Sequence, residues 1–187
     1  TTLIDLILRL LKPLSGNIVI DDKDIKEFTI KTYNSLFGVV PQDPYLFNDS
    51  IKNNIIFGRK NISDEQIDKV IKISKANDFI ELKNKGLNYI IGEKGTNLSG
   101  GEKQKIAIAR ALLTDPEIII FDEAMSSVDN RNMKFINENF NKIFEDKTMI
   151  IIGHSFSALS ICNKFVKIDG GKIQTIIESK EEIEKKI

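Results

Sequence analysis

The feature that most constrains the fold is a set of short runs in which nearly every residue is apolar, most clearly residues 118–121 and 149–152. A strand that is buried on both faces has this pattern, whereas a strand with one face in solvent alternates apolar and polar residues. Because these runs alternate with helical segments, the sequence predicts an α/β fold with a mostly parallel sheet. The strands are predicted at residues 17–20, 36–40, 117–121, 149–152, 165–169 and 172–177.

The middle of the chain has a different character. Helical periodicity is found in residues 63–76, 77–82 and 99–113. Ser63 and Gln66 match a capping box, which marks the start of a helix. The sequence therefore predicts a helical subdomain of residues 45–115, inserted into a core formed by residues 1–44 and 116–187.

Composition excludes several classes of protein. The chain has 187 residues, of which 41% are hydrophobic and 29% charged, as expected for an ordinary globular domain. Lysine and arginine together number 27 and so do aspartate and glutamate, so we expect no nucleic-acid partner. One cysteine and one histidine make a structural zinc site unexpected and favour a reducing compartment. The apolar runs are far shorter than the roughly 20 residues of a membrane-spanning helix.

Residues 98–102 read Leu-Ser-Gly-Gly-Glu and precede a helical segment. Gly100 and Gly101 allow backbone N–H groups to approach a phosphate closely, and Ser99 adds a hydroxyl donor. The positive end of the helix dipole also favours an anion at this place. We therefore predict that Ser99, Gly100, Gly101 and Glu102 bind a phosphate group. An ordinary serine-capped helix that starts with a glycine turn is the alternative.

The apolar run at residues 118–121 ends in two carboxylates, Asp122 and Glu123. Ligands of open α/β sheets bind beyond the carboxyl ends of the strands, where these two side chains are expected. The predicted roles are Mg²⁺ binding by Asp122 and orientation of an attacking water by Glu123. A strand end that simply faces solvent is the alternative.

These two motifs, in this order, resemble those of the ABC ATPase family, and the resemblance extends over essentially the whole chain. It implies a P-loop NTPase fold of the RecA-like type that binds ATP and Mg²⁺. Gln42 matches the glutamine that contacts Mg²⁺ and the attacking water, and His154 matches the switch histidine that contacts the γ-phosphate. Asp129 matches the D-loop aspartate, which helps to join two facing subunits. Met125 and Ser155 depart from the usual family pattern.

The N-terminal segment carries apolar residues at helical spacing over residues 3–11, and Pro13 follows, so a buried helix is predicted there. Aligned with the family, Thr1 falls on the hydroxyl residue of the Walker A loop that binds Mg²⁺, with Thr2 beside it. The glycines and the lysine of that loop are not among the 187 residues, nor is an upstream aromatic residue that stacks on adenine. We expect the sequence to be part of a longer polypeptide, and the 187-residue chain alone to bind ATP weakly.

Two further segments resemble those of exporter-type members of the family, namely residues 44–51 and 91–95. In that subfamily both contact helices of the transmembrane domain. If these segments do contact a partner, Tyr45, Leu46 and Phe47 are expected to be exposed and to form an apolar patch on the surface, which is typical of an interaction site. Two ordinary surface loops are the alternative.

The resemblance implies a head-to-tail dimer with a second nucleotide-binding domain, in which each ATP lies between the Walker motifs of one subunit and the signature of the other. The predicted function is ATP hydrolysis that drives export, at the cytoplasmic or organelle-matrix face of a membrane, of a cargo that the chain does not identify. Two alternatives stay open. One is an ABC ATPase of translation or DNA repair, and the other is a non-catalytic ATP-binding regulatory subunit, against which Gln42, Glu123 and His154 argue.

Overall fold

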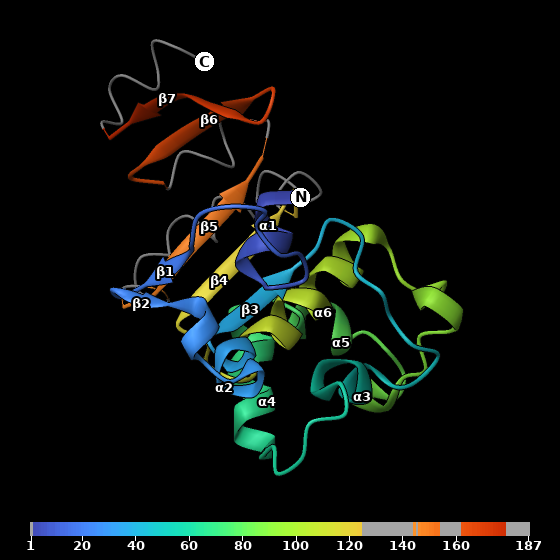
Figure 1. Cartoon of the computed structure of the whole chain (residues 1–187). Coiled ribbons are helices and arrows are strands. Elements are labelled where there is room, and N and C mark those ends of the chain that lie inside the picture. Colours follow the sequence, from blue (N-terminus) through green and yellow to red (C-terminus); the bar gives the residue numbers. More distant parts are fainter. Residues whose placement is uncertain (1, 125–143, 145, 154–161, 179–187) are drawn as a thin grey trace.

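The computed structural model describes residues 2–124, 144, 146–153 and 162–178. Figure 1 shows the elements in chain order. The helices and 3-10 turns are α1 (Thr2–Ile7), η1 (Ile25–Glu27), α2 (Ile30–Ser35), α3 (Ile51–Ile56), α4 (Asp64–Ile73), α5 (Asn77–Ile80), η2 (Gly86–Asn88), η3 (Glu93–Gly95) and α6 (Gly100–Leu112). The strands are β1 (Val19–Ile20), β2 (Lys23–Asp24), β3 (Phe37–Val40), β4 (Ile118–Asp122), β5 (Thr148–Ile152), β6 (Phe165–Asp169) and β7 (Lys172–Ile177).

The central sheet has the order β3-β4-β5, and both strand pairs are parallel. Val40 lies opposite Phe121, and Asp122 lies opposite Ile152, so the three strands end at the same edge. Two antiparallel hairpins, β1-β2 and β6-β7, complete the described strands. The predicted α/β fold with a parallel sheet is thus confirmed, as are all six predicted strands, to within one or two residues at most ends.

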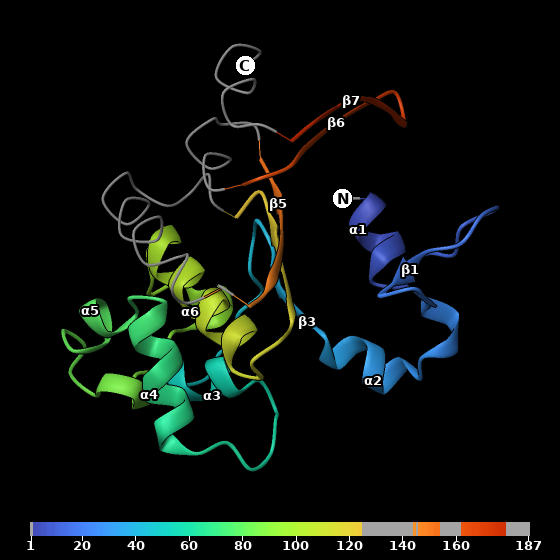
Figure 2. The same cartoon turned by 90° about the vertical axis from the view of Figure 1, so that its left-hand side faces the viewer.

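Successive residues of the central strand face opposite layers of helices. Ile119 and Phe121 belong to a core shared with α3, α4, α5 and α6, whereas Ile120 belongs to a second core. That second core contains Ile4 of α1 and Tyr33 of α2. Figure 2 shows the sheet between these two layers. This cover on both faces explains why the strand is apolar at every position.

The first core runs without a break from the sheet into the helical segment of the chain. Its members include Phe121 of the sheet, Ile67 of α4 and Ile106 of α6. Between residues 45 and 115 the regular elements are helices and 3-10 turns, joined by loops, turns and one isolated bridge. The division into a helical subdomain of residues 45–115 and a core of residues 1–44 and 116–187 stays a prediction.

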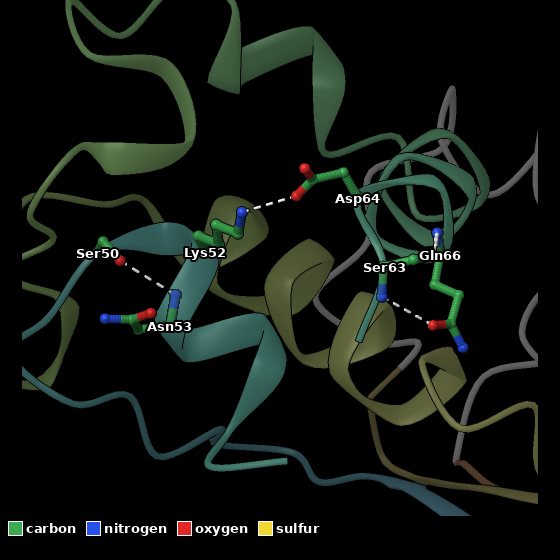
Figure 3. Close-up of polar contacts among 6 residues, drawn as sticks. All are labelled: Ser50, Lys52, Asn53, Ser63, Asp64 and Gln66. Carbon is green, nitrogen blue, oxygen red and sulfur yellow. Dashed lines mark hydrogen bonds and ion pairs between the residues drawn. The ribbon is translucent and has the colours of Figure 1, made fainter. Parts of the chain in front are cut away.

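Side-chain caps define where the short helices begin, and Figure 3 shows two of them. Ser63 and Gln66 form the predicted capping box at the start of α4, with the Ser63 N–H donating to Gln66 Oε1 at 2.9 Å. Ser50 caps α3 by accepting from the backbone N–H of Asn53 at 3.1 Å. A salt bridge of 2.8 Å between Lys52 and Asp64, also drawn in Figure 3, links the two helices.

The N-terminal helix is shorter and less buried than the sequence predicts. Helix α1 ends at Ile7 because Arg9 adopts a left-handed conformation with φ of 59°. The Arg9 guanidinium instead donates to the carbonyls of Ile25 and Phe28 at 3.0 Å each. Of the helix, only Ile4 is buried. Among the described residues, no helix is both long and apolar enough to cross a bilayer.

Candidate functional site

The carboxyl-terminal edge of the sheet brings three predicted site residues to one side of the fold. Asp122 is the last residue of β4, and Glu123 follows it. Gln42 lies two residues beyond the end of β3, the strand next to β4, and its side chain is exposed. Asp122 and Glu123 are both partly exposed. The expected placement of these oxygen-bearing side chains at a common sheet edge is therefore observed.

Glu123 has a backbone conformation that the sequence did not reveal. Its φ is 52°, in the left-handed region that residues other than glycine, asparagine and aspartate rarely adopt. Its N–H still donates to the Ile152 carbonyl at 3.0 Å, so the chain leaves the sheet only after this residue. Sparsely populated backbone conformations of this kind concentrate at functional sites, where the surrounding structure holds them in place.

The predicted phosphate-binding segment forms the start of α6. Ser99 is its N-cap in an extended conformation, and its Oγ accepts from the Glu102 N–H at 3.3 Å. The Glu102 carboxylate accepts from the Ser99 N–H at 2.7 Å, which completes a second capping box. Burial would raise the pKa of the Glu102 carboxyl, but hydrogen bonds from Ser99 and Lys83 outweigh it and hold the pKa below its ordinary value.

Gly100 and Gly101 occupy the first two positions of α6, and both are exposed. A Cβ added at either would meet no described atom within 4 Å apart from its own helix and chain neighbours, so no contact in the described part of the chain requires glycine there. The first N–H groups of a helix have no partner within the helix. Two glycines thus leave backbone donors open to a group that approaches from outside, which is the arrangement that an anion site needs.

Helix α6 lies with its N-terminal half near the carboxyl-terminal edge of the sheet. Gln104, which is buried, donates to the Pro41 carbonyl at 3.3 Å, next to Gln42. At its other end the helix packs on Gly38 in β3. The start of α6 and the ends of the strands therefore lie on the same side of the fold. The contact of Gln104 was not predicted, because one glutamine in a helix gives no sequence signal of its partner.

The two segments that resemble exporter contacts, 44–51 and 91–95, lie side by side. The Ile51 N–H donates to the Tyr89 carbonyl at 3.0 Å, and the Ile91 N–H donates to the Asp49 carbonyl at 3.1 Å. Leu46 is only 1% exposed and packs beside Gly95, so its predicted exposure is wrong. Its side chain fills the space between the two segments instead of facing solvent.

An aromatic patch, formed by Tyr45, Phe47 and Phe57, is exposed on the surface. Tyr45 and Phe47 have ring centroids 5.2 Å apart in an edge-to-face arrangement, and Phe47 and Phe57 are 5.5 Å apart. The three side chains are 59%, 47% and 45% exposed. Sequence reasoning missed Phe57 because it follows a helix of six residues, too short to give a clear period.

Arg110 of α6 contacts the aromatic patch. Its guanidinium lies 4.4 Å from the Phe57 ring centroid and donates to the carbonyls of Tyr45 and Asn54, at 2.9 Å each. Burial, together with the charge of Arg59, lowers the pKa of Arg110 to about 10, so the side chain remains charged at neutral pH.

We expect Arg110→Met to lower the free energy of unfolding by about 2 kcal/mol, because the Tyr45 and Asn54 carbonyls lose a charged donor. Urea-induced unfolding measures this loss. Lys103→Met, on the same helix, is the matched control and is expected to stay within about 0.5 kcal/mol. Equal stability of the Arg110 and Lys103 variants would show that the guanidinium does not hold this surface.

Four predicted site residues need separate mention. Thr2 is the first described residue of α1 and is exposed. Thr1, Asp129 and His154 lie outside the described residues, so their roles stay predictions.

Known proteins match both the sequence and the fold. The profile of the ABC transporter family matches residues 1–126. ABC transporter B family member 21 of Arabidopsis thaliana is 39% identical over 173 residues, which are 92% of this chain and 13% of that protein. The putative export ATP-binding/permease protein RT0691 of Rickettsia typhi is 40% identical over 175 residues, 94% of this chain and 30% of that protein.

A solved structure described as a bacterial Atm1-family ABC exporter with ATP bound matches with a TM-score of 0.92 and 34% sequence identity. The match covers 99% of this chain and 32% of that one. The chain thus spans less than a third of the length of these relatives. These matches confirm the predicted fold class, an α/β P-loop NTPase. Since the family profile covers the central sheet strands β3 and β4, the glycine pair of α6 and the carboxylates that end β4, the chain belongs to the ABC transporter family.

Proposed function

We propose that this chain binds and hydrolyses ATP as the nucleotide-binding domain of an ABC exporter. The observation that carries the proposal is the open start of α6, where Gly100 and Gly101 are exposed and no contact among the described residues requires glycine. Membership of the family and the names of its relatives, which include export proteins, support the same function.

In this proposal the start of α6 serves an ATP that a second nucleotide-binding domain holds. The Gly100 and Gly101 N–H groups and the Ser99 hydroxyl donate to the γ-phosphate, and the helix dipole adds to the attraction. Each nucleotide then contacts two domains, so ATP binding joins them. Loss of the γ-phosphate removes contacts that both domains share, and the pair loosens.

The sheet edge supplies the second half of the site. The carboxylate of Asp122 and the amide oxygen of Gln42 are oxygen donors of the kind that Mg²⁺ prefers, which fits a metal site shared with phosphate oxygens. Mg²⁺, when bound, neutralises charge on the phosphates. Glu123 orients and polarises the attacking water as a general base. Thr1 and Thr2 complete the phosphate contacts, His154 contacts the γ-phosphate, and Asp129 contacts the second domain.

The aromatic patch gives this domain a surface for the transmembrane helices. Tyr45, Phe47 and Phe57 offer exposed rings, and Arg110 contacts the Phe57 ring and the Tyr45 backbone carbonyl. Large exposed apolar groups that are held rigidly mark interaction sites. Segment 44–51 contains Tyr45 and Phe47, and the hydrogen bond from the Ile91 N–H to the Asp49 carbonyl joins segment 91–95 to it. We propose that both contact the membrane domain, at the cytoplasmic or organelle-matrix face.

The proposal is tested by Gly101→Asp in the full-length protein. An acidic residue in the first turn is favourable for a helix, so stability should be unchanged or slightly higher. The same carboxylate repels a γ-phosphate, so we expect ATP turnover to fall by about 100-fold. This is the size of effect that follows the loss of one hydrogen-bond donor to an anionic transition state. Unfolding in urea and steady-state ATPase activity separate the two effects. Full turnover in this variant would exclude the start of α6 from the nucleotide site.

A further inference from the structure

The capping box of α6 places a negative charge beside the proposed phosphate site. The equivalent box of α4 uses Gln66, whose neutral amide accepts from the Ser63 N–H at 2.9 Å. In α6 the same position holds Glu102, whose carboxylate accepts from the Ser99 N–H at 2.7 Å. Both boxes cap a helix, but only the second brings an anion next to the place where the proposed function puts a polyphosphate. In this inference the Glu102 side chain therefore acts as the cap of α6, and not as a phosphate ligand as its place in the signature segment predicted. Two negative groups at such a distance repel each other.

Lys83, in the loop after α5, forms an ion pair with the Glu102 carboxylate. Its Nζ lies 3.2 Å from Glu102 Oε1, while the other carboxylate oxygen, Oε2, accepts from Ser99. The two side chains are 21% and 22% exposed, so solvent screens the pair only in part. The Lys83 ammonium also lies 5.3 Å from the ring centroid of Tyr89 and 5.9 Å from that of Phe79, which fix its position.

We propose that Lys83 is a positioning residue of the nucleotide site: it neutralises Glu102, so that an acidic cap can hold the start of α6 without repelling the γ-phosphate. The inference rests on the proposed function, and it adds a residue outside the signature segment to the site. Lys83 acts through Glu102 rather than by touching the nucleotide. The glutamate keeps a strong charge-assisted hydrogen bond to Ser99, and the lysine reduces the repulsion between the Glu102 carboxylate and the γ-phosphate.

The test is a double-mutant comparison by steady-state ATPase assay in the full-length protein. Lys83→Met keeps the apolar stem beside Phe79 and Tyr89 but exposes the Glu102 charge to ATP. We expect the KM for ATP to rise about tenfold at low ionic strength, and the rise to shrink as salt is added. In the Lys83→Met/Glu102→Gln double variant the cap is neutral, as in α4, and the KM should return to within about threefold of the parent value.

Two further variants separate charge from structure. Lys83→Arg keeps the positive charge and should recover most of the loss. Lys105→Met is the matched control, because Lys105 also lies on α6 but pairs with Asp78, at 3.7 Å, instead of with Glu102. The KM of the Lys105 variant is expected to change less than twofold. Urea unfolding of each variant identifies any loss that comes from misfolding.

Two results would overturn the inference. If the double variant keeps the raised KM of Lys83→Met, the lysine acts on the nucleotide directly or through the structure alone. If Lys83→Met leaves the KM unchanged at low salt, Glu102 needs no neutralising partner. The proposed function fails separately, if the parent protein does not hydrolyse ATP or if Gly101→Asp leaves its turnover intact.

Discussion

Glu123→Gln in the full-length protein is expected to slow ATP turnover by roughly 10²- to 10⁴-fold, the range typical of losing a general base. Glutamine keeps the size of the side chain and its place after β4, but it cannot accept a proton from the attacking water. ATP binding itself needs no such proton transfer. The variant should therefore accumulate as a pair of domains joined by ATP, which size-exclusion chromatography with radiolabelled ATP detects.

The matched control for this variant is Glu117→Gln. Glu117 is exposed and lies just before the same strand, at the opposite edge of the sheet. We expect its turnover to stay within about twofold of the parent, since surface changes away from a site have small effects. If Glu123→Gln retained parental turnover, another group would have to activate the water.

Gly38→Val is expected to lower the free energy of unfolding by about 3 kcal/mol, near the upper part of the range for overpacked cores. A Cβ at Gly38 would lie 2.5 Å from the Ala111 carbonyl oxygen and 2.8 Å from Pro116 Cγ. Neither group can rotate away, because one is helix backbone and the other a ring. Helix α6 would have to move off β3. Urea-induced unfolding of the chain measures the loss.

The control for Gly38 comes from α6 itself. Gly100→Ala adds a methyl group that meets nothing within 4 Å, at a helical position where alanine is favoured by up to about 1 kcal/mol. Its stability should be equal to or above that of the parent. A Gly38 variant as stable as the Gly100 variant would show that the close approach of α6 to the sheet is not required.

The sheet and its edge followed from the sequence because their cause is local. An all-apolar run such as residues 118–121 reports its own burial, and parallel strands end at one edge, which places Asp122, Glu123 and Gln42 together. The capping box of Ser63 and Gln66 was likewise predicted, since its two partners are only three residues apart.

The remaining features depend on contacts between distant parts of the chain. Leu46 was expected to be exposed beside its aromatic neighbours, yet it is buried because Gly95 leaves room for it. Arg110 and Tyr45 are 65 positions apart, so no local sequence pattern predicts the hydrogen bond between them. The length of the helix predicted at residues 3–11 was overestimated. Arg9 has a left-handed backbone conformation and hydrogen-bonds to the distant carbonyls of Ile25 and Phe28, which no local pattern predicts.

The central claim is that the start of α6 serves a nucleotide held by another domain. It is tested most directly by cryo-electron microscopy of the full-length Glu123→Gln protein with ATP and Mg²⁺. We predict that each γ-phosphate lies within hydrogen-bonding distance of Ser99 and Gly101 of one domain, and beside Gln42 and Asp122 of the other. An ATP held by one domain alone, with Ser99 and Gly101 facing solvent, would contradict this account.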